Sequence, residues 1–166
     1  MNIEIKKLSA NDWQIFKELR LQMLKEEPQA FARTYDEVSK RTDEEWKENT
    51  ENEEAGILAV WLDGKLAGMN GYYYPERSIV EIWGMFIRKE FRGMGLGKKL
   101  MGEIEKEIRK DGGVKKIQVS VTSSQTAAFE LYKKLGFREI KRMPNKTRLN
   151  GQSYEEILLE KLIPQP

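Results

Sequence analysis

The sequence of 166 residues contains no cysteine and no histidine. Without cysteine there is no disulfide, no zinc site built on thiolates and no cysteine nucleophile. Without histidine, Ser-His-Asp catalysis, imidazole acid–base chemistry and most transition-metal sites are excluded, so we expect no metal. Any proton transfer must use Glu, Asp, Tyr, Lys, water or a substrate.

Long hydrophobic runs and a strong net charge are also missing. No apolar run approaches the length of a membrane-spanning helix, and the N-terminal Met1–Lys6 lacks the basic and apolar blocks of a signal peptide. The 29 basic and 27 acidic residues leave a net charge of +2, which gives no reason to expect nucleic acid or a membrane as a partner. We therefore expect one cytoplasmic domain over residues 1–166, and the sequence leaves a homodimer open.

A glycine-rich segment, Arg92-Gly93-Met94-Gly95-Leu96-Gly97, is the most informative feature that is present. The apolar run 82–87 precedes it, and apolar residues at helical spacing follow it from Leu96 to Ile108. A strand, a glycine loop and a helix in this order direct unpaired N–H groups and the helix dipole at one spot, which suits a phosphate. Arg92 occupies the place of a Walker glycine and Lys98 that of the third dinucleotide-motif glycine, so both nucleotide motifs fail.

Local patterns predict elements along the rest of the chain. Alternation predicts a first strand at Ile3 and Ile5, and Ser9 precedes a helix that ends at Pro28. Residues 28–41 show no periodicity and are predicted to be irregular, whereas Thr42-Asp-Glu-Glu45 has capping-box spacing and predicts a short helix. Residues 57–62 and 65–74 flank Asp63-Gly64, a typical two-residue hairpin turn.

The second half is predicted to alternate strands and helices before two closing strands. We expect a strand at 78–87, a helix at 96–110, a strand at 115–121 and a helix at 124–135 with Gly136 as its C-cap. Strands at 137–143 and 153–162 follow, joined by a loop that contains Pro144, Asn150 and Gly151. The unit 79–121 should form a right-handed parallel crossover within a mixed sheet.

Two motifs resemble the GCN5-related N-acetyltransferase (GNAT) superfamily. Arg92, Gly95 and Gly97 match its Arg-x-x-Gly-x-Gly signature. The segment from Gln125 through Tyr132 to Leu-Gly-Phe137 resembles its Asn-x-x-Ala-x-x-x-Tyr element, with Gln125 where Asn is usual. The resemblance implies an α/β (α+β) fold with a mixed, centrally splayed sheet of about seven strands and about four helices, and acetyl-CoA as the acyl-donor cosubstrate.

The resemblance also implies roles for particular residues. Tyr132 would protonate the departing thiolate, although it also belongs to an apolar helical stripe that could be core. Backbone N–H groups of the strand would polarise the thioester carbonyl, and the glycine loop would hold the phosphates. The implied cofactor-binding residues are Met85, Phe86, Ile87, Arg92, Gly93, Met94, Gly95, Leu96, Gly97, Lys98 and Gln125.

The general base and the acceptor site are read from the residues themselves. Glu81 interrupts the apolar stretch 79–87, and burial there would raise its pKa towards that of a useful base. The alternatives are a solvent-facing or ion-paired Glu81 and a water relay with no dedicated base. We expect Trp83, Phe31, Tyr35 and Asp36 to line the acceptor cleft, although such aromatic residues can equally be core.

The sequence therefore predicts an N-acetyltransferase that moves acetyl from acetyl-CoA to a primary amine of a small molecule or protein. The alternative is a non-catalytic acyl-CoA-binding or regulatory module that keeps the phosphate loop without turnover. Fold resemblance does not choose the acceptor.

Overall fold

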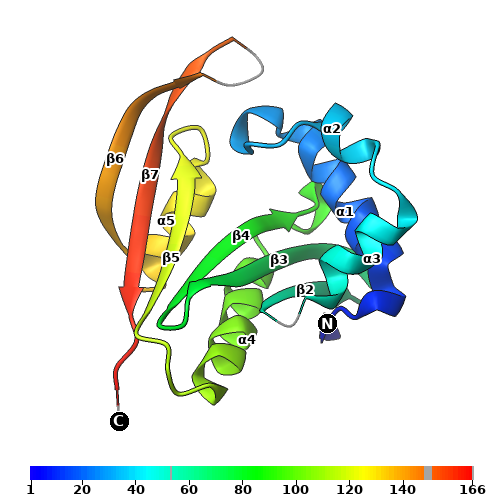
Figure 1. The fold of residues 1–166 in the computed structure, drawn as a ribbon, viewed down its shortest axis with the longest axis horizontal. Coiled ribbons are helices and arrows are strands. Elements are labelled where there is room, and N and C mark those ends of the chain that lie inside the picture. The colour runs from blue at the N-terminus through cyan, green and yellow to red at the C-terminus, as the bar shows by residue number, and fades with distance from the viewer. Residues whose placement is uncertain (53, 148–150, 166) are drawn as a thin grey trace.

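The computed structural model describes residues 1–52, 54–147 and 151–165. Its strands form one seven-stranded sheet with α-helices on both faces (Figure 1). The strands are β1 (Ile3–Lys7), β2 (Ala55–Leu62), β3 (Lys65–Glu76), β4 (Ile79–Ile87), β5 (Lys116–Thr122), β6 (Arg138–Thr147) and β7 (Ser153–Leu162). The helices are α1 (Trp13–Glu26), α2 (Tyr35–Ser39), α3 (Asp43–Glu51), α4 (Leu96–Lys110) and α5 (Thr126–Lys134), with 3-10 turns η1 (Ala10–Asp12), η2 (Pro28–Ala30) and η3 (Lys89–Phe91).

The sheet is mixed, as predicted. Its strand order is β1-β2-β3-β4-β5-β7-β6, with β4 and β5 parallel and the other neighbours antiparallel. The parallel pairing expected for residues 79–121 is therefore confirmed, and α4 connects the two strands. The β2–β3 hairpin is confirmed too, because Asp63 and Gly64 have positive φ angles of 48° and 79°, as its two-residue turn requires.

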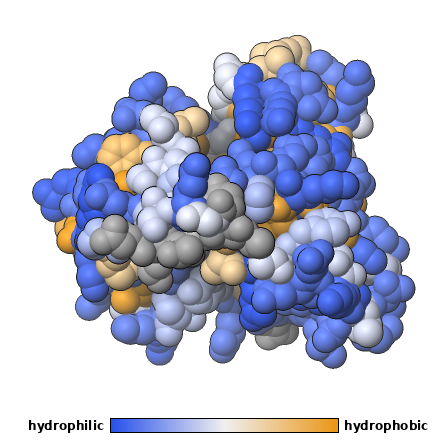
Figure 2. Space-filling model, turned by 90° about the horizontal axis from the view of Figure 1, so that it is seen from above, coloured by the Kyte–Doolittle hydropathy of each residue, from blue (hydrophilic) through white to orange (hydrophobic). Residues whose placement is uncertain are grey.

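Two hydrophobic cores lie on opposite faces of the sheet. One contains the apolar stripe of α4, whose five predicted residues from Leu96 to Ile108 are all buried. The other contains α1 and α3, where Phe16 and Trp46 meet edge to face at 5.4 Å. Alternate residues of β2 serve the two cores, since successive side chains of a strand point to opposite faces. The face of the molecule seen in Figure 2 is mostly hydrophilic, with small apolar patches.

The segment 28–41 is more regular than the sequence predicted. It contains η2 and the short helix α2, which is capped by Thr34 and Glu37: the Thr34 N–H donates to Glu37 at 3.1 Å and the Glu37 N–H to Thr34 Oγ1 at 3.2 Å. Five residues are too few to show helical periodicity, which is why the pattern was missed. The structure thus has five α-helices among its described residues, against about four expected.

Strand β6 continues past its predicted end at Met143, through Pro144 to Thr147. It is the edge strand of the sheet, where a missing N–H need not break a ladder of hydrogen bonds, so proline is tolerated. The register shifts at this point, between Met143 and Lys146. Asn150 of the predicted loop lies outside the described residues.

A bulge in β4 reverses which face its side chains reach. Trp83 pairs with Gly71 and Phe86 with Met69, so Gly84, whose φ is +64°, and Met85 share one partner position on β3. Before the bulge, even-numbered residues join the α4 core; after it, Met85 packs on that core and Phe86 joins the α1 core. One extra residue in a strand has this effect because the side-chain period is two.

Strands β4 and β5 pair at one end only. Their parallel register runs from Ile79–Lys116 to Ile82–Val119 and then stops. Figure 1 shows the two strands diverging towards their carboxyl ends. The expected central splay is therefore present, and it separates the strands next to the bulge.

Candidate active site

A cavity of about 330 Å³ lies where β4 and β5 separate. Because the strands are unpaired there, residues from both faces of the sheet border one space. The lining residues are Arg20, Ala30, Phe31, Ala32, Arg33, Glu81, Ile82, Trp83, Gly84, Met85, Val119, Ser120, Val121, Thr122, Gln125, Ala128, Tyr132 and Glu156.

This cavity brings together residues that the sequence singled out far apart. Six of the predicted site residues line it: Phe31, Glu81, Trp83, Met85, Gln125 and Tyr132. Tyr35 and Asp36 do not line it; both are exposed in α2, and Tyr35 stacks against Lys25 at 5.9 Å.

Tyr132 projects from α5 and is only 1% exposed. Its ring meets Phe137 edge to face at 5.3 Å, so the ring is indeed part of the core. The hydroxyl makes no hydrogen bond within the described part of the chain, and burial raises its pKa. The ring therefore packs, and the hydroxyl keeps its proton at neutral pH next to the cavity.

The sequence left open whether Glu81 is buried among apolar side chains or faces solvent, and its environment in the structure lies between these alternatives. Glu81 is half-buried, and the hydroxyl of Tyr73 donates a hydrogen bond to Glu81 Oε2 at 2.7 Å. Tyr73 stands directly opposite Glu81 in the β3–β4 register. Burial, and then this hydrogen bond, raise the pKa of Tyr73 to about 12, so the phenol is a stable donor to the carboxylate.

The glycine loop runs directly into α4. Gly93 and Gly95 both have φ of +77°, a left-handed conformation that suits glycine, and Gly95 is the N-cap of the helix. A Cβ on either glycine would meet no atom within 4 Å, so the space beside them is open. A Cβ on Gly97 would lie 3.8 Å from the sulfur of Met85, so the start of the helix adjoins a residue that lines the cavity.

The side chains of this loop differ in their contacts and exposure. Arg92 turns back to the strand end, where its Nε donates to the carbonyl of Ile87 at 2.8 Å and its Nη2 lies 3.3 Å from Glu27. Met94 and Lys98 are exposed, whereas Leu96 is buried under the helix.

Gln125 holds the turn between β5 and α5. The side-chain Oε1 of Gln125 accepts a hydrogen bond from the backbone N–H of Thr122 at 2.9 Å. The backbone N–H of Gln125 in turn donates to the carbonyl of Thr122 at 2.9 Å. Gln125 lines the cavity, and its carboxamide nitrogen makes no hydrogen bond within the described residues. The longer Gln side chain therefore caps the turn and still presents an N–H₂ group.

Three charged lining residues were missed by the sequence reasoning: Arg20 of α1, Arg33 after η2, and Glu156 of β7. Arg20 stacks on Trp83 at 5.5 Å and on Phe31 at 5.8 Å. No local signal marks them, because each reaches the cavity only through the tertiary fold.

A model of the acetyltransferase (GNAT) family matches residues 18–137 of the chain. The chain belongs to this family. Over 81 residues it is 33% identical to an L-2,4-diaminobutyric acid acetyltransferase of Vibrio parahaemolyticus, covering 47% of this chain and 44% of that protein. The chain thus spans less than half the length of this curated relative.

Solved structures of GNAT acetyltransferases share the fold. An acetyltransferase of this family from Streptococcus pneumoniae has a TM-score of 0.84 at 22% identity, covering 98% of this chain and all of that one. A Salmonella typhimurium acetyltransferase, solved with its cofactor acetyl-CoA, has a TM-score of 0.79 at 18% identity, covering 100% of this chain and 96% of that one.

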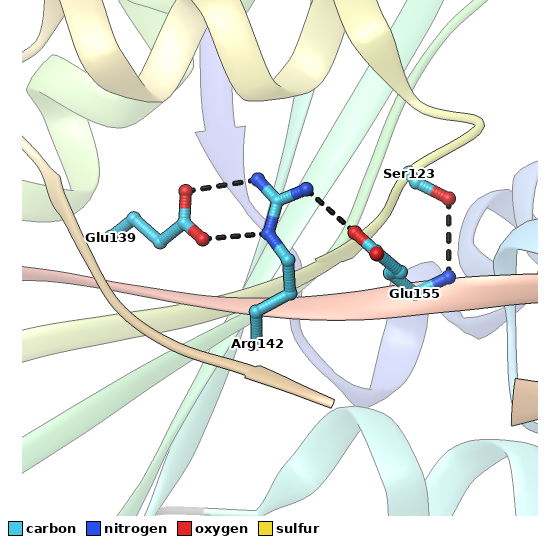
Figure 3. Close-up of polar contacts among 4 residues, drawn as sticks. All are labelled: Ser123, Glu139, Arg142 and Glu155. Carbon is cyan, nitrogen blue, oxygen red and sulfur yellow. Dashed lines mark hydrogen bonds and ion pairs between the residues drawn. The ribbon is translucent and has the colours of Figure 1, made fainter. Parts of the chain in front are cut away.

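An ionic network joins the β6–β7 hairpin to the turn between β5 and α5 (Figure 3). Arg142 Nε donates to Glu139 at 2.7 Å and its Nη1 to Glu155 at 2.6 Å. The Glu155 N–H donates to Ser123 Oγ at 3.1 Å, and the Ser123 N–H to the Glu155 carbonyl at 2.9 Å. Ser123 and Glu155 each follow or precede a residue that lines the cavity, Thr122 and Glu156, so the network lies beside the cavity wall.

No helix in the described ranges has the length and apolar character needed to span a bilayer. In the same residues, no group of three or more carboxylates is placed to hold a metal ion.

Proposed function

We propose that the protein is an N-acetyltransferase that moves the acetyl group of acetyl-CoA to a primary amine by direct attack on the thioester. One observation carries the proposal: the glycine loop adjoins Met85, which lines the same cavity as Tyr132. The loop that we assign to the phosphates thus lies next to a residue of the cavity wall, and the proton donor that we assign lines the same cavity. This arrangement supports transfer from a phosphate-bearing thioester.

The residues present suit acetyl-CoA. Two left-handed glycines with open space beside them precede a helix of 15 residues, whose first N–H groups and dipole attract phosphate. The bulge leaves Met85 without its own partner on β3, and β5 has already separated, so backbone groups here are available to a carbonyl oxygen. Bound acetyl-CoA supplies the thioester and a thiolate leaving group.

The roles of the chain's own residues follow from this arrangement. We assign the glycine loop, residues 92–98, to the phosphates, with Arg92 orienting the loop through Glu27. Met85, Phe86 and Ile87 provide the backbone near the thioester, and Gln125 an amide donor.

Tyr132 donates a hydrogen bond or its proton to the sulfur as the C–S bond breaks. Glu81, directly or through water, takes the proton that the amine nitrogen loses as its bond to the acetyl carbon forms. Trp83 and Phe31 form apolar parts of the acceptor wall. Contact of Tyr35 and Asp36 with the acceptor stays a prediction, tested by the acceptor KM of Tyr35→Ala and Asp36→Asn.

An amine panel with acetyl-CoA tests the function, with release of free thiol as the readout and reactions lacking amine as the blank. The expected result is amine-dependent thiol release with one class of acceptor. Acetyl-CoA binding by calorimetry without thiol release from any amine would favour the non-catalytic acyl-CoA-binding module. Absence of binding would contradict both.

A cytoplasmic location stays a prediction from the sequence. The sequence is also compatible with a homodimer. Light scattering of the purified chain measures its oligomeric state, and cell fractionation its location.

A further inference from the structure

Arg20 occupies an unusual place for an arginine. Its guanidinium carbon lies over two aromatic rings, 5.5 Å from the centre of the Trp83 ring and 5.8 Å from that of the Phe31 ring. Its Nη1 would lie 3.8 Å from a Cβ built on Gly84, which places the charge beside the β4 bulge. A partly buried cation therefore forms part of the cavity wall where the strands separate.

This cation has no counter-charge of its own. Within the described ranges, Arg20 makes no ion pair and no side-chain hydrogen bond, and the same holds for Arg33, which also lines the cavity. Burial, and then the charges of Arg41 and Arg33, lower the pKa of Arg20 to about 10. Arg20 is thus a desolvated guanidinium with two further positive charges nearby. This arrangement costs free energy unless a bound anion neutralises it.

Stacking on aromatic rings offsets part of this cost. It leaves the donors of the guanidinium unused, because aromatic faces accept only weakly. Arginine presents these donors in a planar fork that matches a carboxylate. The stacking therefore orients the fork and leaves its edge for a ligand.

The opposite charges stand elsewhere on the same wall. Glu81 comes from β4 and Glu156 from β7, whereas Arg20 and Arg33 come from α1 and from the segment after η2. One small cavity thus has a cationic part and an anionic part. A ligand with an amine and an anion separated by a few bonds would match both parts at once.

We propose that the acceptor amine belongs to a small amino carboxylate, and that Arg20, assisted by Arg33, binds its carboxylate. This inference rests on the proposed acetyl transfer and names its acceptor class. Polyamines and aminoglycosides, which carry only positive charge, would leave the arginines unmatched. Trp83 and Phe31, which hold Arg20, would also contact the apolar part of the acceptor.

Matched acceptors test the proposal, each free amino acid being compared with its own carboxamide. The pair shares the amine and side chain and differs in the negative charge. Because a hydrogen bond between two charged groups is among the strong ones, we expect kcat/KM to be about 30-fold higher for the acid, mainly through KM.

Variants assign the preference to the arginines. In Arg20→Met the ratio of kcat/KM for the acid to that for its carboxamide should fall below about threefold, with the acetyl-CoA dissociation constant unchanged. Arg20→Lys should retain part of this preference for the acid. Arg33→Met, at an exposed position, gives a second variant that does not depend on a buried side chain. Arg77→Met, an exposed arginine outside this cavity, is the matched control and should keep the full preference.

The outcomes separate this inference from the proposed function. Equal use of acid and carboxamide by the wild-type protein would overturn the acceptor class while acetyl transfer stands. A loss of acetyl-CoA affinity in Arg20→Met would assign the arginine to the cosubstrate instead. If no amine releases thiol, calorimetric titration of the CoA-bound protein with each acid and its carboxamide still decides, because equal binding overturns the anion site and selective binding of the acid supports it.

Discussion

Replacing Tyr132 with phenylalanine removes a single hydroxyl from the wall of the cavity. The ring keeps its edge-to-face contact with Phe137, and the helix keeps its packing. No described residue loses a hydrogen-bond partner, since the hydroxyl bonds to none of them. We therefore expect the free energy of unfolding to change by less than about 1 kcal/mol.

The effect on catalysis should be much larger. In the transition state the hydroxyl would face a sulfur that is gaining negative charge, and a hydrogen bond to a charged group contributes about 1.5–3 kcal/mol. That range corresponds to about 10- to 150-fold in rate. We expect kcat to fall by about 100-fold while the dissociation constant of acetyl-CoA stays the same.

The pKa of Tyr132 fixes how this deficit depends on pH. Burial raises the pKa of the phenol above its ordinary value, so the donor keeps its proton throughout the neutral range. The deficit of Tyr132→Phe should thus be constant between about pH 6 and 9. The stability that the neutral phenol contributes is fully present below the unfolded-state pKa of about 10 and is lost as the pH rises above it.

The assay is thiol release under saturating acetyl-CoA, with calorimetry for binding and urea unfolding for stability. Tyr74→Phe, a half-buried tyrosine outside this cavity, is the control and should keep its turnover. A kcat within threefold of wild type in Tyr132→Phe would refute the role of the hydroxyl and leave Tyr132 as a core residue.

The remaining predictions concern the loop, a helix cap and a titration. Gly95→Val should weaken acetyl-CoA binding at least about tenfold, because Gly95 has a φ of +77°. Gly102→Ala, on the exposed side of α4, is the control and should leave the affinity unchanged. If calorimetry gives Gly95→Val the wild-type affinity, the loop is not part of the cosubstrate site. Thr42→Ala should cost about 1 kcal/mol in urea unfolding with unchanged turnover, since Thr42 caps α3, and no loss of stability would contradict the cap. In an alkaline absorbance titration, Tyr73→Phe should remove a tyrosine that ionises near pH 12. In the wild-type protein, the stability that the neutral Tyr73 contributes should be lost between about pH 10 and 12. If the variant instead lacks a step near pH 10, the burial of Tyr73 and its hydrogen bond to Glu81 are contradicted.

Elements with strong local signals were predictable from the sequence. The five-residue apolar stripe of α4 and the Asp63-Gly64 turn lie at or near the places that the patterns gave, because each depends on neighbours within a few residues. Helix α2 had a usable signal that periodicity does not detect, since Thr34-Tyr-Asp-Glu37 has the same capping spacing as Thr42-Asp-Glu-Glu45.

The candidate site divides in the same way. The glycine loop and Tyr132 could be predicted because motif spacing alone marks them. Arg20 could not, since its position depends on Trp83 and Gly84, which are distant in the sequence and meet it only across the sheet. The sequence left the environment of Glu81 open because Tyr73, its partner across β3 and β4, becomes a neighbour only once the register of the two strands is known.

The bulge at Gly84 explains how one strand can serve both reactants. Without it, Trp83 and Met85 would point to the same face, because they are two residues apart. With it, Trp83 packs towards α1 and Arg20, whereas Met85 packs towards α4 and the glycine loop. The cavity where β4 and β5 separate is lined by Tyr132, which belongs to the α4 core, and by Arg20 of α1. If the proposed acetyl transfer holds, we expect the acyl donor on the side of the glycine loop and the acceptor on the side of Arg20.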